Sequence, residues 1–133
     1  MPADLNQLAR ANVKNPVQVM VTKSATTATG VTQAVHHTTH DSKATLLVSL
    51  LGENKDSVLV FTRTKHRADK LGRLLGSAGH KVAVIHGNRS LSQRRAALEG
   101  FRRGTFRVLV ATDIAARGID VANIGHVVNF DVP

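Results

Sequence analysis

The chain has 133 residues, no cysteine, and 18 lysine and arginine residues against 9 acidic ones, a formal net charge of +9. This composition excludes a disulfide framework and thiolate metal sites, and no apolar run is long enough to span a membrane or patterned as a secretion signal. We therefore expect a cytoplasmic domain with a polyanionic partner such as nucleic acid, because a strongly positive field concentrates polyanions.

The start of the chain carries local signals for a helix, a strand and a connector. Apolar residues at helical spacing predict a helix over residues 3–12, which ends before Asn15-Pro16 because a residue that precedes proline avoids the helical region. A short strand is predicted over residues 17–21. Residues 22–30 are rich in Thr, Ser, Ala and Gly without apolar periodicity, so we interpret them as a linker. The main domain is then expected over residues 31–133.

Short apolar runs alternate with amphipathic segments in the main domain. The apolar runs predict strands over residues 58–61, 82–85, 108–111 and 127–130. Their continuous apolar character indicates that helices cover both faces of a parallel sheet. Amphipathic stripes predict helices around residues 46–51, 68–78 and 91–103, the last opened by a capping box of Ser90 and Gln93. This order predicts an α/β fold, an open parallel sheet with helices on both faces.

Polar and basic residues follow the predicted strands. In a doubly wound sheet, ligands bind beyond the carboxyl ends of the strands. Those ends read Phe61-Thr62-Arg63-Thr64, His86-Gly87-Asn88-Arg89, Ala111-Thr112-Asp113 and Asp131. This edge is therefore the predicted binding edge.

Charged residues on two predicted helices have different interpretations. Lys65, Asp69 and Arg73 recur every four residues, which indicates a solvated face of ion pairs. Arg94 falls within an apolar stripe and in the first helical turn, where a cation is disfavoured. Either the aliphatic part of its side chain packs against the apolar stripe while the guanidinium reaches water, or the guanidinium forms an anion-binding site. We favour the second interpretation, with Arg94 holding a phosphate and Asp113 steadying it.

Several segments resemble motifs of one enzyme family. Ala111-Thr112-Asp113 through Arg117-Gly118-Ile119-Asp120 is similar to motif V of the DEAD-box ATP-dependent RNA helicases, and Val58 through Lys65 resembles motif IV. His86-Gly87-Asn88 and Phe101-Arg102-Arg103-Gly104 also match the family in order and spacing. The resemblance covers essentially the whole chain. It implies the C-terminal RecA-like lobe over residues 31–133, with residues 1–21 as the tail of the first RecA-like lobe.

The resemblance also implies the roles of individual residues. It implies RNA-backbone contacts by Thr64, Gly87, Asn88, Arg94, Thr112 and Gly118, and ATP contacts by Gly118 and Asp120. Asp113 and Arg117 would link the RNA-facing and ATP-facing sides or the two lobes. ATP and Mg²⁺ are the implied cofactors, with Mg²⁺ held by the first lobe, and RNA and the first lobe are the implied partners. Leu91, where the family commonly has glutamine, and Asn88, where aspartate is frequent, leave the details of the RNA grip open.

The family's final arginine-rich motif would follow residue 133, and neither a Gly-Lys-Thr loop nor an Asp-Glu-Ala-Asp segment occurs in the sequence. We therefore expect no catalytic residues and no ATP hydrolysis from these residues alone, because the missing arginines stabilise phosphoryl transfer. Strand edges left uncovered are expected to favour self-association.

Other functions stay open from the sequence. His36, His37 and His40 lack the thiolates or paired carboxylates of a metal site, so no metal is expected. The aromatic residues are four phenylalanines, which argues against base stacking and favours recognition of the nucleic-acid backbone. The alternatives are a lobe of a superfamily 2 DNA helicase or translocase, and a non-catalytic basic module that binds nucleic acid.

Overall fold

The computed structural model describes residues 11–12, 30–53, 55–116 and 124–132. The chain divides into two units, Met1–His36 and His37–Pro133, and each is described by itself. Among the described residues, no helix has the length and apolar character needed to cross a bilayer.

The first unit is described at few positions. Ala11 and Asn12 are helical, in agreement with the helix predicted to end there. Residues 30–36 form neither helix nor strand. The strand predicted over residues 17–21 and nearly all of the predicted linker lie outside the described residues.

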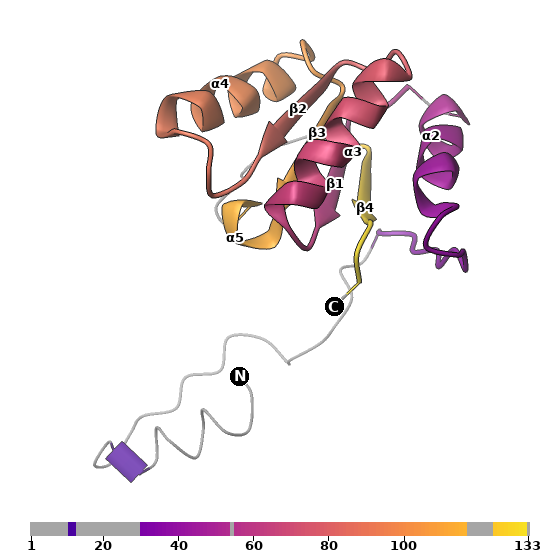
Figure 1. Cartoon of the computed structure of the whole chain (residues 1–133), viewed down its shortest axis with the longest axis horizontal. Coiled ribbons are helices and arrows are strands. Elements are labelled where there is room, and N and C mark those ends of the chain that lie inside the picture. The colour runs from indigo at the N-terminus through magenta and orange to yellow at the C-terminus, as the bar shows by residue number, and fades with distance from the viewer. Residues whose placement is uncertain (1–10, 13–29, 54, 117–123, 133) are drawn as a thin grey trace. The chain divides into compact units, whose positions relative to one another are not determined.

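The second unit alternates helices and strands in the predicted order. Its elements are α2 (Lys43–Glu53), β1 (Val58–Thr62), α3 (Lys65–Ser77), β2 (Val82–Ile85), α4 (Leu91–Arg102), β3 (Val108–Thr112), α5 (Asp113–Ala116) and β4 (His126–Asn129) (Figure 1). The strands form one four-stranded sheet in the order β2-β3-β1-β4, and each neighbouring pair is parallel. The predicted α/β class is confirmed.

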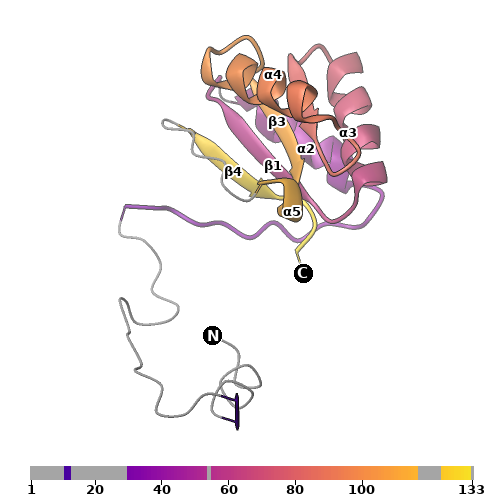
Figure 2. The same cartoon turned by 90° about the vertical axis from the view of Figure 1, so that its left-hand side faces the viewer.

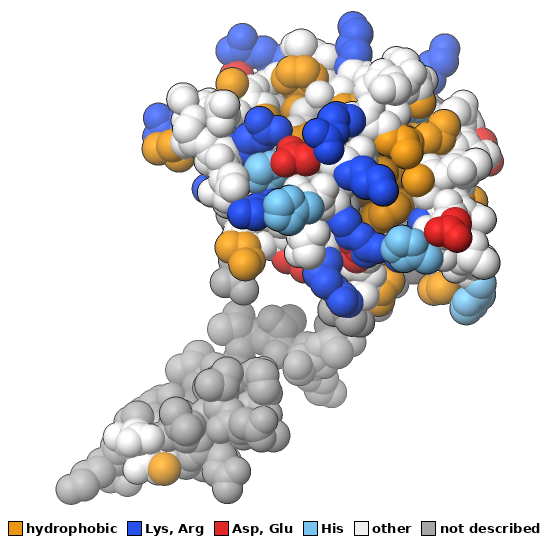
Figure 3. Space-filling model, in the orientation of Figure 1, with side chains coloured by type: hydrophobic (Ala, Val, Ile, Leu, Met, Phe, Trp, Pro, Cys, Tyr) orange, Lys and Arg blue, Asp and Glu red, His pale blue; other side chains and the backbone are white. Residues whose placement is uncertain are grey.

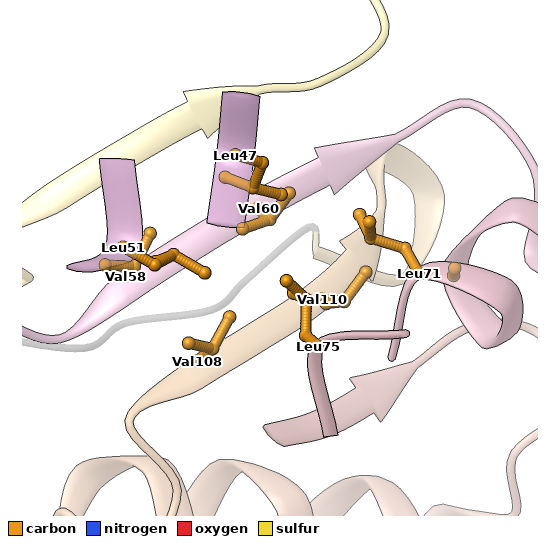
Figure 4. Packing of buried hydrophobic residues seen from close by; sticks show 9 residues of the cluster. Leu47, Leu51, Val58, Val60, Leu71, Leu75, Val108 and Val110 are labelled. Atoms are coloured by element: carbon orange, nitrogen blue, oxygen red, sulfur yellow. The ribbon is translucent and has the colours of Figure 1, made fainter. Parts of the chain in front are cut away.

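Helices cover both faces of this sheet because alternate residues of each inner strand point to opposite sides. Val58 and Val60 of β1 pack with α2 and α3, whereas Leu59 packs with α4 and α5 (Figures 1 and 2). Figure 4 shows the first of these clusters, in which Leu47 of α2 and Leu71 of α3 converge on the strands. Every residue of the central strand β3 is buried. The core therefore surrounds β1 and β3 and holds their carboxyl ends in fixed places.

The helix starts follow from capping residues at the ends of loops. The Thr64 side chain accepts a hydrogen bond from the Arg67 N–H and caps α3. Ser90 and Gln93 form the predicted capping box at the start of α4. Such caps satisfy backbone N–H groups that the first turn leaves unpaired. Because α3 follows β1 and α4 follows β2 after short loops, both helices begin at the edge of the sheet where these strands end.

The prediction that both faces of the last strand are buried is wrong. The strand is β4, shifted by one residue from the predicted range, and Val127 is 50% exposed. Within the described part of the chain, β4 pairs with β1 alone, so it is an edge strand, and edge strands are less completely covered. This agrees with the expected uncovered edge, and self-association stays a prediction.

Candidate nucleic-acid interface

The predicted site residues of the described chain gather at one edge of the sheet. The registers align Thr62 with Thr112 and Ile85 with Ala111, so β1, β2 and β3 end nearly level. The residues at or just after these ends, or in the first turn of the helix that follows, are Thr64, Gly87, Asn88, Arg94, Thr112 and Asp113. In Figure 1, α5 and the first turn of α3 lie at this same edge. We call it the carboxyl edge.

Thr64 keeps a free donor although it serves as a helix cap. Its hydroxyl oxygen accepts the Arg67 N–H at 3.2 Å, and its side chain lies on the exposed side of the loop. A hydroxyl has one donor and two acceptor positions, so the O–H can still donate to a phosphate oxygen. The cap thus orients the hydroxyl without using up its donor.

Arg94 is held by the backbone of α5. Its Nη2 donates to the Ala115 carbonyl at 3.1 Å, and its buried Nε has no hydrogen-bond partner among the residues that the structure describes. The expected partner was Asp113; among the described residues the contact of Arg94 is instead with the Ala115 carbonyl, and Asp113 lies exposed at the start of α5. A guanidinium carries five N–H donors, so the remaining ones can serve a phosphate.

The loop after β2 is held by a histidine that the sequence did not single out. His86 is 3% exposed, its Nε2 lies 3.0 Å from Oδ1 of Asp69, and its Nδ1 lies 3.3 Å from the Asn88 nitrogen. Asn88 in turn accepts a hydrogen bond from the Lys65 ammonium group at 3.2 Å. The loop is therefore tied to the start of α3 at two points.

Asp69 does not belong to a solvated ion-pair face with Lys65 and Arg73, so that interpretation is wrong. It contacts His86 and the Arg89 guanidinium, which donates from Nη2 at 2.9 Å. Asp69 and Lys65 lie on the side of α3 that faces the loop after β2, so cross-element contacts replace contacts along the helix. Burial raises the pKa of Asp69, but the hydrogen bond from His86 and the charge of Arg89 together lower it below its usual range.

Basic side chains surround this edge. Figure 3 shows lysine, arginine and histidine side chains gathered on the face over α3, with few acidic ones among them. Asp69, which lies on this helix, is engaged by His86 and Arg89. At the strand ends Arg63, Lys65, Arg67, Arg89 and Arg94 outnumber Asp69, Asp113 and Asp131, so the carboxyl edge presents net positive charge to an incoming polyanion.

Comparison with known proteins identifies the domain. The family described as helicase conserved C-terminal domain matches residues 42–133. The chain belongs to this family. It is 42% identical over 135 residues to the RNA helicase CrhR of Synechocystis, covering 100% of this chain and 27% of that protein. It is 36% identical over 132 residues to the ATP-dependent RNA helicase vasa of Drosophila melanogaster, covering 99% and 20%.

Solved structures agree with this helicase domain. The Escherichia coli DEAD-box protein SrmB, solved with regulator of ribonuclease activity A, is 38% identical with a TM-score of 0.66, covering 70% of this chain and 55% of that one. Saccharomyces cerevisiae Dbp5, solved with RNA and ADP BeF3, is 36% identical with a TM-score of 0.64, covering 70% and 24%. The predicted RecA-like fold and DEAD-box resemblance are confirmed. The chain spans 18% to 28% of the length of the curated relatives that it matches.

A second carboxylate organises the helicase domain where β4 ends. The Asp131 side chain is 3% exposed and accepts the Arg63 N–H at 3.1 Å. It also pairs with the Arg67 guanidinium, and the Lys43 ammonium lies 3.5 Å away. Because the Arg63 N–H directly precedes Thr64, this carboxylate fixes the loop that carries a predicted RNA contact. The sequence places Asp131 at a strand end, but its partners are distant in the chain and leave no local signal.

Three predicted site residues cannot be placed. Arg117, Gly118 and Asp120, the predicted motif-linking and ATP-contacting positions, lie outside the described residues. Among those that are described, no group of three or more His, Cys, Asp or Glu side chains could hold a metal ion. His40 contacts the Arg67 guanidinium instead.

Asp69→Asn tests the electrostatics of the loop after β2. The pKa of Asp69 is lower in the folded chain than in the unfolded chain, so its carboxylate stabilises the fold above about pH 4. This stabilisation is lost as the pH falls through the folded pKa. We expect Asp69→Asn to cost about 1 kcal/mol at pH 7, a value reduced by solvent screening, and much less near pH 3. Urea unfolding at both pH values measures this. Glu99→Gln, which breaks an exposed pair with Arg103, is the control and should change little.

Proposed function

We propose that this domain is the RNA-binding and ATP-sandwiching second lobe of an ATP-dependent RNA helicase. The observation that carries the proposal is the gathering of Thr64, Gly87, Asn88, Arg94 and Thr112 along one positively charged edge of the sheet. Relatives named as RNA helicases, and a related protein solved with RNA, support the same partner.

The available groups favour the sugar-phosphate backbone of RNA over its bases. The Thr64 hydroxyl, the Arg94 guanidinium and the Gly87 N–H are donors, which suit phosphate oxygens. Large aromatic platforms for base stacking are missing, since the sequence contains four Phe and no Trp or Tyr. Binding should therefore tolerate different RNA sequences and weaken with salt.

The same edge suits a first lobe and a nucleotide. Leu91 and Ile114 are 62% and 80% exposed at this edge, and we propose that they contact the first lobe. Asp113 and Arg117 are proposed to link the lobes. Gly118 and Asp120 are the proposed ATP contacts. Bound ATP would supply the energy for lobe closure, with its Mg²⁺ held by the first lobe.

Closure of two such lobes on one RNA strand would bend it and so destabilise a short duplex. The residues of this domain would hold the strand by its phosphates during closure. We propose that these 133 residues alone do not hydrolyse ATP. Detection of RNA-stimulated ATPase activity from the purified chain would contradict this.

Arg94→Ala is the experiment that tests the RNA contact. Losing a charge-assisted hydrogen bond to phosphate should weaken binding of a short single-stranded RNA about tenfold. It should also lower the slope of log affinity against log salt by about 0.7, the value for one phosphate on a single strand. Fluorescence anisotropy of a labelled oligoribonucleotide, measured at several salt concentrations, gives both numbers.

Arg95→Ala is the matched control for Arg94→Ala. Arg95 is exposed on the same helix and carries the same charge, so its loss tests for a general charge effect. If both variants lose RNA affinity equally, the result would contradict a specific contact between Arg94 and RNA. A DNA strand of the same sequence serves as the second probe, and tighter binding of DNA would favour a DNA helicase or translocase.

A further inference from the structure

We infer that His86 is a positioning residue that sets which backbone amides of the loop after β2 face the RNA. The inference rests on the proposed function, because it concerns the Gly87 position of the same RNA interface. It adds His86, with its partners Asp69 and Arg89, to the residues on which RNA binding depends.

Both ring nitrogens of His86 are engaged inside the fold. The Asn88 N–H donates to Nδ1 at 3.3 Å, so Nδ1 acts as the acceptor and Nε2 carries the proton that it donates to Asp69 at 3.0 Å. The His86 side chain is 4% exposed, and both hydrogen bonds are partly buried. Arg89 holds the same Oδ1 atom of Asp69 at 2.9 Å, which fixes the carboxylate that orients the ring.

This arrangement divides the amides of the loop between the interior and the solvent. The Asn88 N–H turns inward to His86, and the Arg89 N–H donates to the His86 carbonyl at 3.0 Å. The Gly87 N–H makes no hydrogen bond to any described residue, and Gly87 is exposed. Gly87 is thus the amide that the loop leaves for a ligand.

The space beside Gly87 supports this reading. A Cβ built at Gly87 would meet no described atom within 4 Å, so the described residues do not crowd this position. The Lys65 ammonium is anchored by the Asn88 side-chain oxygen at 3.2 Å and has further N–H donors. The exposed Gly87 amide and the exposed Lys65 ammonium group therefore both have N–H donors left for a phosphate oxygen.

Two substitutions separate the two hydrogen bonds of His86. The side-chain amide of asparagine places an oxygen near the position of Nδ1, so His86→Asn keeps an acceptor for the Asn88 N–H. The amide of glutamine reaches the position of Nε2, so His86→Gln keeps the donor to Asp69 but loses that acceptor. We expect His86→Gln to weaken RNA binding about fivefold, the effect of one hydrogen bond, and His86→Asn to stay within about twofold of the unsubstituted chain.

The measurement is RNA anisotropy on the whole chain, with urea unfolding of each variant in parallel and amide NMR spectra with and without RNA. A positioning role predicts that RNA affinity depends on whether residue 86 offers an acceptor to the Asn88 N–H, and not on the stability of the variant. It also predicts that RNA shifts the Gly87 amide signal in His86→Asn but not in His86→Gln. If both variants bind RNA in proportion to their stability, or if His86→Gln binds as tightly as the unsubstituted chain, the inference is overturned. If the unsubstituted chain does not bind RNA at all, that result would instead contradict the proposed function.

Discussion

Asp131→Ala is expected to lower the free energy of unfolding by about 3 kcal/mol, because it removes the carboxylate from a nearly buried charge cluster. The Asp131 side chain is 3% exposed, whereas those of Arg67 and Lys43 are 37% and 31% exposed. The two cations can turn partly toward water after the substitution, which keeps the loss at the low end for a broken buried pair. The Arg63 N–H loses its acceptor as well. The loop before α3 should therefore loosen in the folded state.

Urea denaturation followed by circular dichroism measures this loss, since the chain has no Trp or Tyr for fluorescence. Asp41→Ala is the matched control, because the Asp41 side chain is fully exposed and its one described pair is with His40 at 3.6 Å. That control should stay within about 0.5 kcal/mol of the unsubstituted chain. Equal stabilities for the two variants would show that the Asp131 cluster contributes nothing net.

Leu109→Ala is expected to cost about 3 kcal/mol through loss of apolar contacts and the cavity left behind. Leu109 has no exposed surface and lies on β3, the strand flanked by β1 and β2. Its side chain packs in the cluster that joins the sheet to α4, together with Phe101 and Ala97. Neighbours on both sides are held by sheet hydrogen bonds, so collapse into the cavity should be small.

The same unfolding experiment tests Leu109→Ala. Leu91→Ala removes the same atoms from a side chain that is 62% exposed, so it should change stability by less than about 0.5 kcal/mol. A loss below about 1 kcal/mol for Leu109→Ala would mean that the core around α4 repacks freely. In that case the carboxyl edge would not be rigidly supported on this face of the sheet.

The inner strands could be predicted because their signal is local. A strand covered on both faces needs apolar residues in succession, and residues 58–61 and 108–111 have them. The residues at 127–130 show the limit of that signal: they are nearly as apolar, yet β4 lies at the edge of the sheet. Whether a strand is central or peripheral depends on its neighbours in space, which a run of apolar residues does not encode.

The members of the candidate site could be predicted better than their contacts. Parallel topology brings strand ends together, so Thr64, Gly87 and Thr112 were expected at one edge. The partners of Asp69 could not be expected from helical periodicity, because His86 and Arg89 lie 17 and 20 residues away in the sequence. Local patterns describe which side of a helix a residue occupies, and the packing of another element decides what it meets there.

The hydrogen bond between Arg94 and Ala115 joins the start of α4 to α5, and α5 leads directly toward Arg117, Gly118 and Asp120. One guanidinium can hold the α5 carbonyl and a phosphate together. A shift of α5 would move the guanidinium that we propose holds a phosphate, and a phosphate bound to Arg94 would in turn bias the position of α5. Thermodynamic reciprocity then requires that whatever binds beyond α5 and whatever binds Arg94 alter each other's affinity by the same factor.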